Sequence, residues 1–555
     1  MKIKIFVIIL LSIFAVLTIS SMRQNSATCD EIAHHIPVGY VLLNKWDFKM
    51  DTSQPPLPRY IVALPLKLFM NINMPDDRAL WRVQDRSIFG RDFFYKYNRD
   101  QIKMVFFARM AVVFIGMLCG LLLFIWAKSL WGERAALFSL FFYALSPNIL
   151  AHAGLATTDM VATFFILLSC YSFWLFLKNA SITNIIFAAV CLGLAELSKY
   201  TAILLYPIFL LSLRGVPPKT LDLAERRAGR RSNPTISKFL SVIFLSLIVV
   251  WAAYGFEFQP LLKDSMRLDE KLQIAHNIAK KVYPHISPAA IDRLDDFLLK
   301  VPVPLGSHIL GIMGVFRHGY EGHSTYFLGR WSSHGDPLYF LVAFLIKTPI
   351  PLIIFLLIGI FIFLKQRSQM GERFIFIVAA VFFVASSLSG LKLGLRHILP
   401  LYPFCFMICG GAVVLLKKKY VNILLYSLMA WYAFISVKTW PHYLGYFNEA
   451  IGGPANGYKY LRDSNVDWGQ DLPSLSRYME KNGIKEIALE YFGQADPVVY
   501  GVHYRKFMPD EFEKPHDAVY AVSAQYLEGV KWTKDHKPAA AAGYSIFIYD
   551  FAKEK

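Results

Sequence analysis

The chain has 555 residues, of which 55% are hydrophobic and only 18% are charged, and its mean hydropathy is +0.41. These values exclude a soluble globular domain and predict a polytopic membrane protein. The formal net charge of +18 would suit a nucleic-acid partner, but the positions of the basic residues fit membrane topology better. We therefore expect the lipid bilayer as the surroundings and no nucleic acid as a partner.

Eleven apolar segments are long enough, or nearly so, to cross a hydrocarbon core of about 30 Å. They are Ile5–Ser21, Met104–Ala127, Ala135–Ala151, Met160–Leu177, Ile182–Leu197, Ala202–Leu213, Phe239–Phe256, Leu338–Leu364, Phe374–Leu391, Ile398–Leu416 and Val421–Val437. The predicted fold is therefore an all-α membrane bundle of about eleven transmembrane helices.

Basic residues follow the alternation of these segments. If Lys2 and Lys4 are cytoplasmic, eleven spans also put the other basic clusters on the inside, as the positive-inside rule requires. These clusters are Lys128 with Arg134, Lys178, the linker Arg214–Lys238, Lys365 with Arg367 and Arg373, and Lys417 to Lys419. The long loops 22–103 and 257–337 and the tail after Lys438 then lie outside. The first segment lacks a convincing cleavage site, so we expect an uncleaved anchor.

The long outer segments have their own patterns. In the first loop, Leu57–Met70 is apolar with two basic breaks, which predicts a helix lying along the membrane interface or packed on the bundle. The second loop combines a charged helical part, Leu262–Lys281, with the Gly/His-rich stretch His318–His323. Five of the six cysteines fall inside spans and only Cys29 lies outside, so no disulfide framework is expected.

Hydropathy falls after Trp440, which predicts a membrane domain over residues 1–439 and a small extracytoplasmic α/β domain over residues 440–555. Strand-like stretches in the tail alternate with one helical pattern. The strands are expected at Ile487–Tyr491, Ala518–Val522 and Ser545–Tyr549, and the helix at Leu472–Lys481.

Polar clusters stand at the outer ends of several spans. They are the acid pair Asp30-Glu31, the turn His152–Asp159, Lys199-Tyr200, Lys347 and Arg396-His397. Ionisable groups beside hydrocarbon are costly unless they are paired or used, so they are functional candidates. Carboxylates and cations on one membrane face suit transfer from a phosphate-linked donor. A carboxylate accepts the proton of the acceptor, and Lys199 and Arg396 bind the departing phosphate.

Each of these residues also has a structural interpretation. Asp30 and Glu31 could be solvated acids at a span end, and Asp159 could cap the following helix. Lys199 and Arg396 could anchor the interface. His34, His35, His152, His318 and His323 could bind a metal, although none has the HExxH spacing.

Together these residues resemble the integral-membrane glycosyltransferases of the GT-C superfamily, in the glycosyltransferase family 39-like branch of protein O-mannosyltransferases and lipid A aminoarabinose transferases. The resemblance covers most of the membrane part. It rests on Asp30-Glu31 with His34 and Gly39, Pro55-Pro56-Leu57, Leu145-Ser146-Pro147-Asn148 through His152 to Asp159, Ser198–Thr201, Lys347-Thr348-Pro349 and Arg396–Pro400. Gln54 stands where relatives commonly have His or Lys, and Arg59 is a possible substitute. The tail motifs Tyr446–Glu449 and Asp463–Asp471 look like those of a bacterial subset.

The resemblance implies a polyprenyl-phosphate sugar donor and one direct, inverting displacement. It implies Asp30 as general base, Glu31 as an assisting or positioning acid, and Asp159 as the second acid of the catalytic set. The donor phosphate would be bound by Lys199, Tyr200, Arg396, His397 and Arg59, while His152, His323 and Lys347 would line the substrate site. The family often works without a tightly bound metal, so no cofactor is firmly implied and a divalent metal remains open.

The expected acceptor is a hydroxyl on a glycan, lipid or protein of the cell envelope, including protein glycosylation, and the expected location is the bacterial inner membrane with an extracytoplasmic active site. Two other classes remain. A transporter or lipid-carrier flippase would place its polar groups near the midplane and show paired repeats, neither of which the sequence has. A non-catalytic membrane subunit would leave the clustered acids and cations unexplained.

Overall fold

The computed structural model describes residues 2–48, 51–75, 86–213, 235–261, 300–365, 370–415 and 419–552. Helices dominate the membrane part. They are α1 (Lys2–Met22), α6 (Gln101–Ala144), α8 (Thr158–Lys178), α9 (Ile182–Glu196), α10 (Leu205–Leu213), α12 (Ile236–Ala253), α16 (Tyr339–Lys347), α17 (Ile350–Lys365), α18 (Met370–Leu388), α19 (Tyr402–Leu415) and α20 (Lys419–Thr439). Most of the basic linker Arg214–Lys238 and the whole of Leu262–Lys281 lie outside the described residues.

All eleven expected segments are wholly or largely helical. Within the described residues, six helices are long and apolar enough to cross a membrane, or up to seven if the bent pair α16 and α17 forms one span. Shorter apolar helices occupy Ile182–Glu196, Tyr200–Leu213 and Ile423–Thr439. The chain is therefore a mostly helical, multi-pass membrane protein.

Local backbone chemistry sets three boundaries in the helices, of which the first agrees with the expected segments and the other two differ from them. Gly132, with φ of 82°, separates two helical arms within α6, and these arms correspond to two expected spans. Pro147 begins a new short helix, α7 (Pro147–Ala153), so the expected segment Ala135–Ala151 is broken near its outer end. The expected segment Leu338–Leu364 is divided into two helices, α16 and α17, with a bend of 116° between them around Thr348-Pro349.

Shorter elements cover the end of the bundle that faces the tail. The first loop forms η1 (Glu31–His35), α2 (Ile36–Lys45), α3 (Pro56–Phe69) and α5 (Arg86–Tyr95), so the helix expected at Leu57–Met70 is confirmed. The second loop contributes the antiparallel pair β1 (Phe258–Gln259) with β2 (Val303–Pro304), the hairpin of β3 (Thr325–Phe327) with β4 (Arg330–Ser332), and helix α15 (Gly306–Glu321). Short helices η2 (Tyr200–Leu204) and η3 (Leu395–Leu401) precede α10 and α19.

The tail contains a mixed five-stranded sheet in the order β6-β5-β7-β9-β8. The strands are β5 (Ile487–Glu490), β6 (Tyr504–Arg505), β7 (Val519–Ser523), β8 (Ala540–Ala542) and β9 (Ile546–Asp550), and α21 (Leu472–Asn482) precedes them. Strand β5 runs parallel to β6 and β7, while β9 is antiparallel to β7 and β8. The helix and the three strands expected from the sequence are confirmed, whereas the short β6 and β8 were not anticipated.

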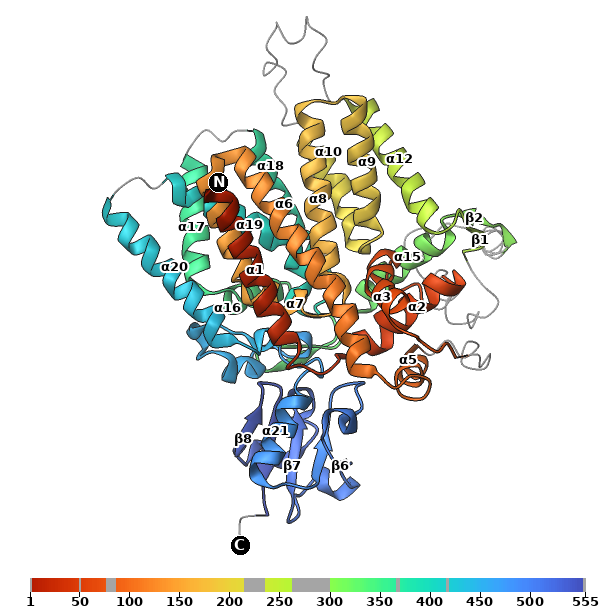
Figure 1. Ribbon diagram of the computed structural model, residues 1–555, viewed down its shortest axis with the longest axis vertical. Helices are drawn as coiled ribbons and strands as arrows, with labels where there is room; N and C mark the ends of the chain where they lie inside the picture. The colour runs from red at the N-terminus through yellow and green to blue at the C-terminus, as the bar shows by residue number, and fades with distance from the viewer. Residues whose placement is uncertain are drawn as a thin grey trace, which may run out of the picture.

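The two ends of the molecule are distinct (Figure 1). The N-terminus lies at the upper end of the bundle, and the sheet domain, drawn in blue, lies below the opposite end together with the helices of the first outer loop. Helix α1 has 21 residues and a rise of about 1.5 Å per residue, so it runs roughly one hydrocarbon thickness from Lys2 to the loop that holds Asp30.

Candidate active site

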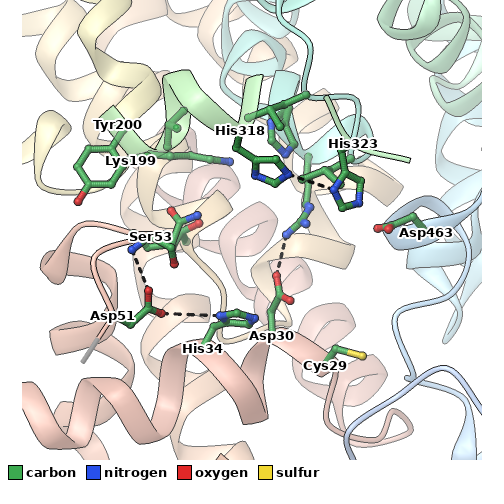
Figure 2. A pocket seen from close by; sticks show the side chains of 18 of the residues that line it. Cys29, Asp30, His34, Asp51, Ser53, Lys199, Tyr200, His318, His323 and Asp463 are labelled. Atoms are coloured by element: carbon green, nitrogen blue, oxygen red, sulfur yellow. Dashed lines mark hydrogen bonds and ion pairs between the residues drawn. The ribbon is translucent and has the colours of Figure 1, made fainter. Parts of the chain in front are cut away.

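A chamber of about 1300 Å³ lies at the end of the bundle that faces the sheet domain. Its walls come from segments far apart in the sequence (Figure 2). They include the first outer loop from Cys29 to Gln54, Thr158, Lys199 to Thr201, α15 with His323, the stretch Leu391 to His397, and Asp463, Trp468, Phe492, Gln525 and Tyr526 of the tail. The chamber thus collects most of the polar span ends that the sequence singled out.

Two acids and two cations form an ionic network at the chamber wall. Lys199 Nζ lies 2.7 Å from Asp159 Oδ1, and Arg396 Nη1 lies 3.0 Å from Asp30 Oδ2 and 4.0 Å from Asp159 Oδ2. Asp159 is almost fully buried, whereas 23% of the Asp30 side chain is exposed. Asp30 is therefore the carboxylate of this network that a substrate can reach. Asp159 lies deeper in the protein, where it pairs with Lys199 and lies near Arg396.

Asp30 is the residue before the short π-helix η1, and its electrostatic surroundings favour the ionised form. Burial alone would raise the pKa of its carboxyl, but Arg396 and His34 outweigh burial and bring the pKa below its ordinary value. A carboxylate that stays ionised at neutral pH and opens onto a cavity can accept a proton from a hydroxyl group.

Arg396 has unused hydrogen-bonding capacity beside Asp30. Its guanidinium packs over the Trp468 ring at 4.3 Å from the centroid, and its Nη1 donates to Asp30. The buried Nε atom has no hydrogen-bond partner among the described residues. An unpaired buried N–H is costly, so this donor is a natural partner for an oxyanion in the chamber.

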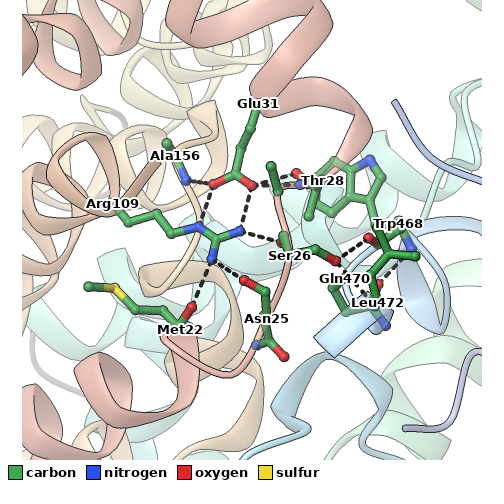
Figure 3. Close-up of polar contacts among 12 residues, drawn as sticks. Met22, Asn25, Ser26, Thr28, Glu31, Arg109, Ala156, Trp468, Gln470 and Leu472 are labelled. Atoms are coloured by element: carbon green, nitrogen blue, oxygen red, sulfur yellow. Dashed lines mark hydrogen bonds and ion pairs between the residues drawn. The ribbon is translucent and has the colours of Figure 1, made fainter. Parts of the chain in front are cut away.

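Glu31 does not line the chamber but anchors the loop that carries Asp30 (Figure 3). Its two carboxylate oxygens accept hydrogen bonds from Arg109 Nε at 2.8 Å and Nη2 at 2.7 Å. They also accept from the backbone N–H groups of Thr28 and Ala156, at 2.8 and 2.7 Å. One buried ion pair therefore joins the Asp30 loop to the turn before α8, which supports the positioning role expected for Glu31.

Arg109 completes that anchor and was not anticipated. Its guanidinium donates to the carbonyl oxygens of Met22 at 2.9 Å, Asn25 at 3.0 Å and Ser26 at 2.7 Å. Three carbonyl groups of the segment between α1 and η1 are thus bound by a single side chain from the first third of the apolar helix α6. A lone arginine in the expected span Met104–Ala127 was the available sequence signal.

A second polar wall is built around Asp51, which the sequence reasoning also missed. Its carboxylate pairs with Arg59 and, at 3.0 Å, with Arg86 Nη1, and it lies 3.8 Å from His34 Nδ1. Arg59 also donates to the carbonyl oxygens of Asp51 and Gln54, and it does not line the chamber. With these contacts Arg59 stabilises the conformation of the loop that contains Asp51 and Gln54.

The other expected site residues divide into two groups. Tyr200, His397 and His323 line the chamber, and His323 Nδ1 lies 3.1 Å from His318 Nε2. Lys347 and His152 are buried and do not line it. Lys347 donates to the carbonyl oxygens of Leu444 and Asn465, at 2.9 and 2.6 Å, so it ties the break between α16 and α17 to the tail.

The tail segment Asp463–Asp471 forms part of the chamber. Besides the contact between Trp468 and Arg396, the N–H of Cys29 donates to Trp468 O at 3.1 Å, and the N–H of Ser26 donates to Gln470 O at 2.9 Å. Asn465 Oδ1 accepts from the N–H of Leu395 at 3.0 Å. The same segment therefore holds the loop of Asp30 and the short helix of Arg396.

Asp467 in that segment gives a pH prediction for stability. The side chain is fully buried, and burial raises its pKa to about 8 despite a hydrogen bond from the N–H of Gly469. At pH values above about 4 the unfolded state releases a proton that the folded state retains. The stability of the folded state should therefore fall as the pH rises from 5 to 8. Asp467→Asn should flatten this fall of the thermal midpoint in detergent, and parallel wild-type and variant curves would contradict the assignment.

Metal ligation finds no support in the arrangement of the described side chains. Over the described ranges, no group of three or more His, Cys, Asp or Glu residues is placed to hold a metal ion. All six cysteines are free, in agreement with their expected positions. The chemistry available in the chamber is that of a carboxylate base beside an arginine and a lysine.

These features define a multi-pass membrane protein with a chamber at one end of its helices that is lined by paired acids and cations. Residues 103–254 match the family model of dolichyl-phosphate-mannose-protein mannosyltransferases. This match agrees with the expected family and with the expected enzyme class, a polyprenyl-phosphate-sugar-dependent glycosyltransferase. No curated protein is significantly similar in sequence to the chain.

Solved structures of similar proteins include ArnT from Cupriavidus metallidurans bound to undecaprenyl phosphate, with 12% identity, coverage of 98% of this chain and 97% of that chain, and a TM-score of 0.49. The archaeal oligosaccharyltransferase AglB from Archaeoglobus fulgidus has 13% identity, coverage of 98% and 74%, and a TM-score of 0.44. The protein O-mannosyltransferase Pmt1-Pmt2 complex from S. cerevisiae has 17% identity, coverage of 46% and 32%, and a TM-score of 0.29.

Proposed function

We propose that the chain moves a sugar from a polyprenyl-phosphate carrier to a hydroxyl of a glycan, lipid or protein, with inversion at the anomeric carbon. The observation that carries this proposal is the pairing of an accessible carboxylate, Asp30, with Arg396 in one chamber, with Lys199 held beside them by Asp159. This set supplies a proton acceptor and two cations within a few ångströms of each other.

The reaction needs one step. Asp30 accepts the proton of the acceptor hydroxyl while that oxygen forms a bond to the anomeric carbon. The bond between this carbon and the phosphate oxygen breaks, and the polyprenyl phosphate leaves with the electron pair. Arg396 and Lys199 stabilise the charge that grows on the leaving phosphate, and the unpaired Nε of Arg396 offers it a further donor. Direct attack from the opposite face inverts the configuration.

The topology proposed with this function has eleven spans, residues 1–439 as the membrane domain and residues 440–555 as the outer domain. The chamber then opens on the extracytoplasmic side of a bacterial inner membrane, since Lys2 and Lys4 stand at the far end of α1. A transporter or flippase is disfavoured because the ionic network lies at the outer ends of helices instead of near the midplane.

Binding of a photoreactive polyprenyl-phosphate probe tests the donor site. Arg396→Ala should weaken probe labelling by roughly 10- to 100-fold, because a charge-assisted hydrogen bond is worth about 1.5–3 kcal/mol. Arg396→Lys should retain part of the labelling, since it keeps the charge and loses the planar fork.

Arg330→Ala is the matched control, because Arg330 is an exposed arginine on β4 outside the chamber lining. Its labelling should equal that of the wild type. Equal labelling of wild type and Arg396→Ala would rule out Arg396 as a phosphate ligand, and no labelling of the wild type would rule out the donor class.

A further inference from the structure

A second cavity, of about 510 Å³, lies between the helix α5 of the first outer loop and the sheet domain. Helix α5 contributes Arg91 and Tyr95, and the tail contributes Glu490, Gln494, Tyr504 and Lys506 among others. The two walls are joined directly, since the N–H of Asp496 donates to the Tyr95 hydroxyl at 3.1 Å.

The position of this cavity in the sheet is the usual position of a binding site. Glu490 ends β5, and residues Tyr491 to Asp496 form the loop that follows it, while Lys506 directly follows β6. Strands β5 and β6 are parallel, so both supply residues from their carboxyl ends. Open α/β sheets bind ligands in the crevice outside the carboxyl ends of parallel strands.

The cavity also adjoins the reaction chamber. Phe492 lines the chamber, whereas its neighbours Tyr491 and Gly493 line the second cavity, so one strand end separates the two. The Tyr491 hydroxyl donates to Gly469 O at 2.5 Å, next to Trp468 of the chamber wall. An acceptor that uses both cavities must therefore extend across this segment.

The lining chemistry selects the class of ligand. Three basic side chains, of Arg91, Lys96 and Lys506, are balanced by three acidic ones, of Asp92, Glu490 and Asp496. Because the positive and negative charges of the lining balance, a polyanionic ligand is disfavoured. Sugar rings pack against the flat faces of tyrosine rings. Sugar hydroxyls donate hydrogen bonds to carboxylates and accept them from cations, and an amide side chain can do both.

We propose that this second cavity binds the carbohydrate part of the acceptor, at a distance from the hydroxyl that receives the sugar. The proposal rests on the proposed function and deepens it, because it selects a glycan-bearing acceptor over a bare peptide. The role of the sheet domain is then to hold the acceptor while Asp30 acts on one of its hydroxyls.

The test measures transfer to a glycan fraction prepared from envelopes of cells that lack the gene. The double variant Gln494→Ala/Lys506→Ala should raise the apparent KM for this fraction roughly tenfold or more, since each lost hydrogen bond costs about 0.5–1.5 kcal/mol and more where a charge takes part. Its kcat and its labelling by the polyprenyl-phosphate probe should stay at the wild-type level.

Lys514→Ala serves as the control, because Lys514 is exposed on the same domain and lies outside the cavity lining. An unchanged KM in the double variant, with an active wild type, would overturn the acceptor cavity and leave the proposed function standing. Transfer by the wild type to protein side chains alone would overturn the carbohydrate assignment. Failure of the wild type to bind the donor probe would overturn both proposals.

Discussion

Asp30→Asn is expected to lower sugar transfer by roughly 10²–10⁴-fold, the usual contribution of a general base. The amide has nearly the shape of the carboxylate but cannot accept the proton of the acceptor hydroxyl. Because Arg396 loses only one charged partner and keeps Asp159 nearby, the variant should still fold and bind the donor probe. Turnover in purified membranes together with probe labelling measures both effects.

Two comparisons sharpen this result. Asp510→Asn changes an exposed acid of the sheet domain and should leave transfer unaltered. The acidic limb of the pH profile should lie below the ordinary pKa of an aspartate, because Arg396 and His34 lower the pKa of Asp30 against the effect of burial. Wild-type turnover by Asp30→Asn would exclude Asp30 as the base.

Glu31→Gln is expected to destabilise the protein by roughly 3–5 kcal/mol, the range for breaking a buried ion pair from one side. The Arg109 guanidinium would remain buried with its charge uncompensated, since both side chains of the pair are at most 2% exposed. Thermal unfolding in detergent measures the loss. Glu133→Gln is the matched control, because Glu133 pairs with Lys128 at the surface, where such pairs are worth about 0–1 kcal/mol.

Removing both charges should cost less than removing one. In Glu31→Leu/Arg109→Met no charge is left unpaired, so its unfolding midpoint should lie above that of Glu31→Gln. Arg109 and the N–H groups of Thr28 and Ala156 hold the pKa of Glu31 below its ordinary value even though burial raises it. This stabilisation is present at neutral pH and lost as the pH falls, so Glu31→Gln should be less sensitive to acid. Equal stability of Glu31→Gln and wild type would contradict the anchoring role.

Local patterns were sufficient to locate the helices and the main strands. Apolar runs and basic residues at their ends mark the spans, and alternation marks β5, β7 and β9, because these features depend on neighbouring residues alone. The bend between α16 and α17 was missed because hydropathy averages over Pro349, whose backbone geometry decides where the helix stops. The division within α6 at Gly132 agrees with the two spans expected on either side of it.

The site was only partly predictable. Acids and cations at span ends indicated the outer face, but the pairing of Asp30 with Arg396 joins residues 366 positions apart and depends on how the helices pack. The same limit explains why Glu31 and Asp30, adjacent in sequence, point to different surroundings. Trp468 and Asp463 belong to the tail motif that the resemblance singled out, but their place in the chamber depends on the tail folding back onto the bundle.

The most direct test of the account compares envelope glycans, lipids and proteins by mass spectrometry in cells without the gene, with the gene restored, and with the Asp30→Asn form restored. We expect one sugar that is missing without the gene, returns with the wild type and stays missing with Asp30→Asn, while its polyprenyl-phosphate donor accumulates. An unchanged envelope without the gene, or full return of the sugar with Asp30→Asn, would contradict it.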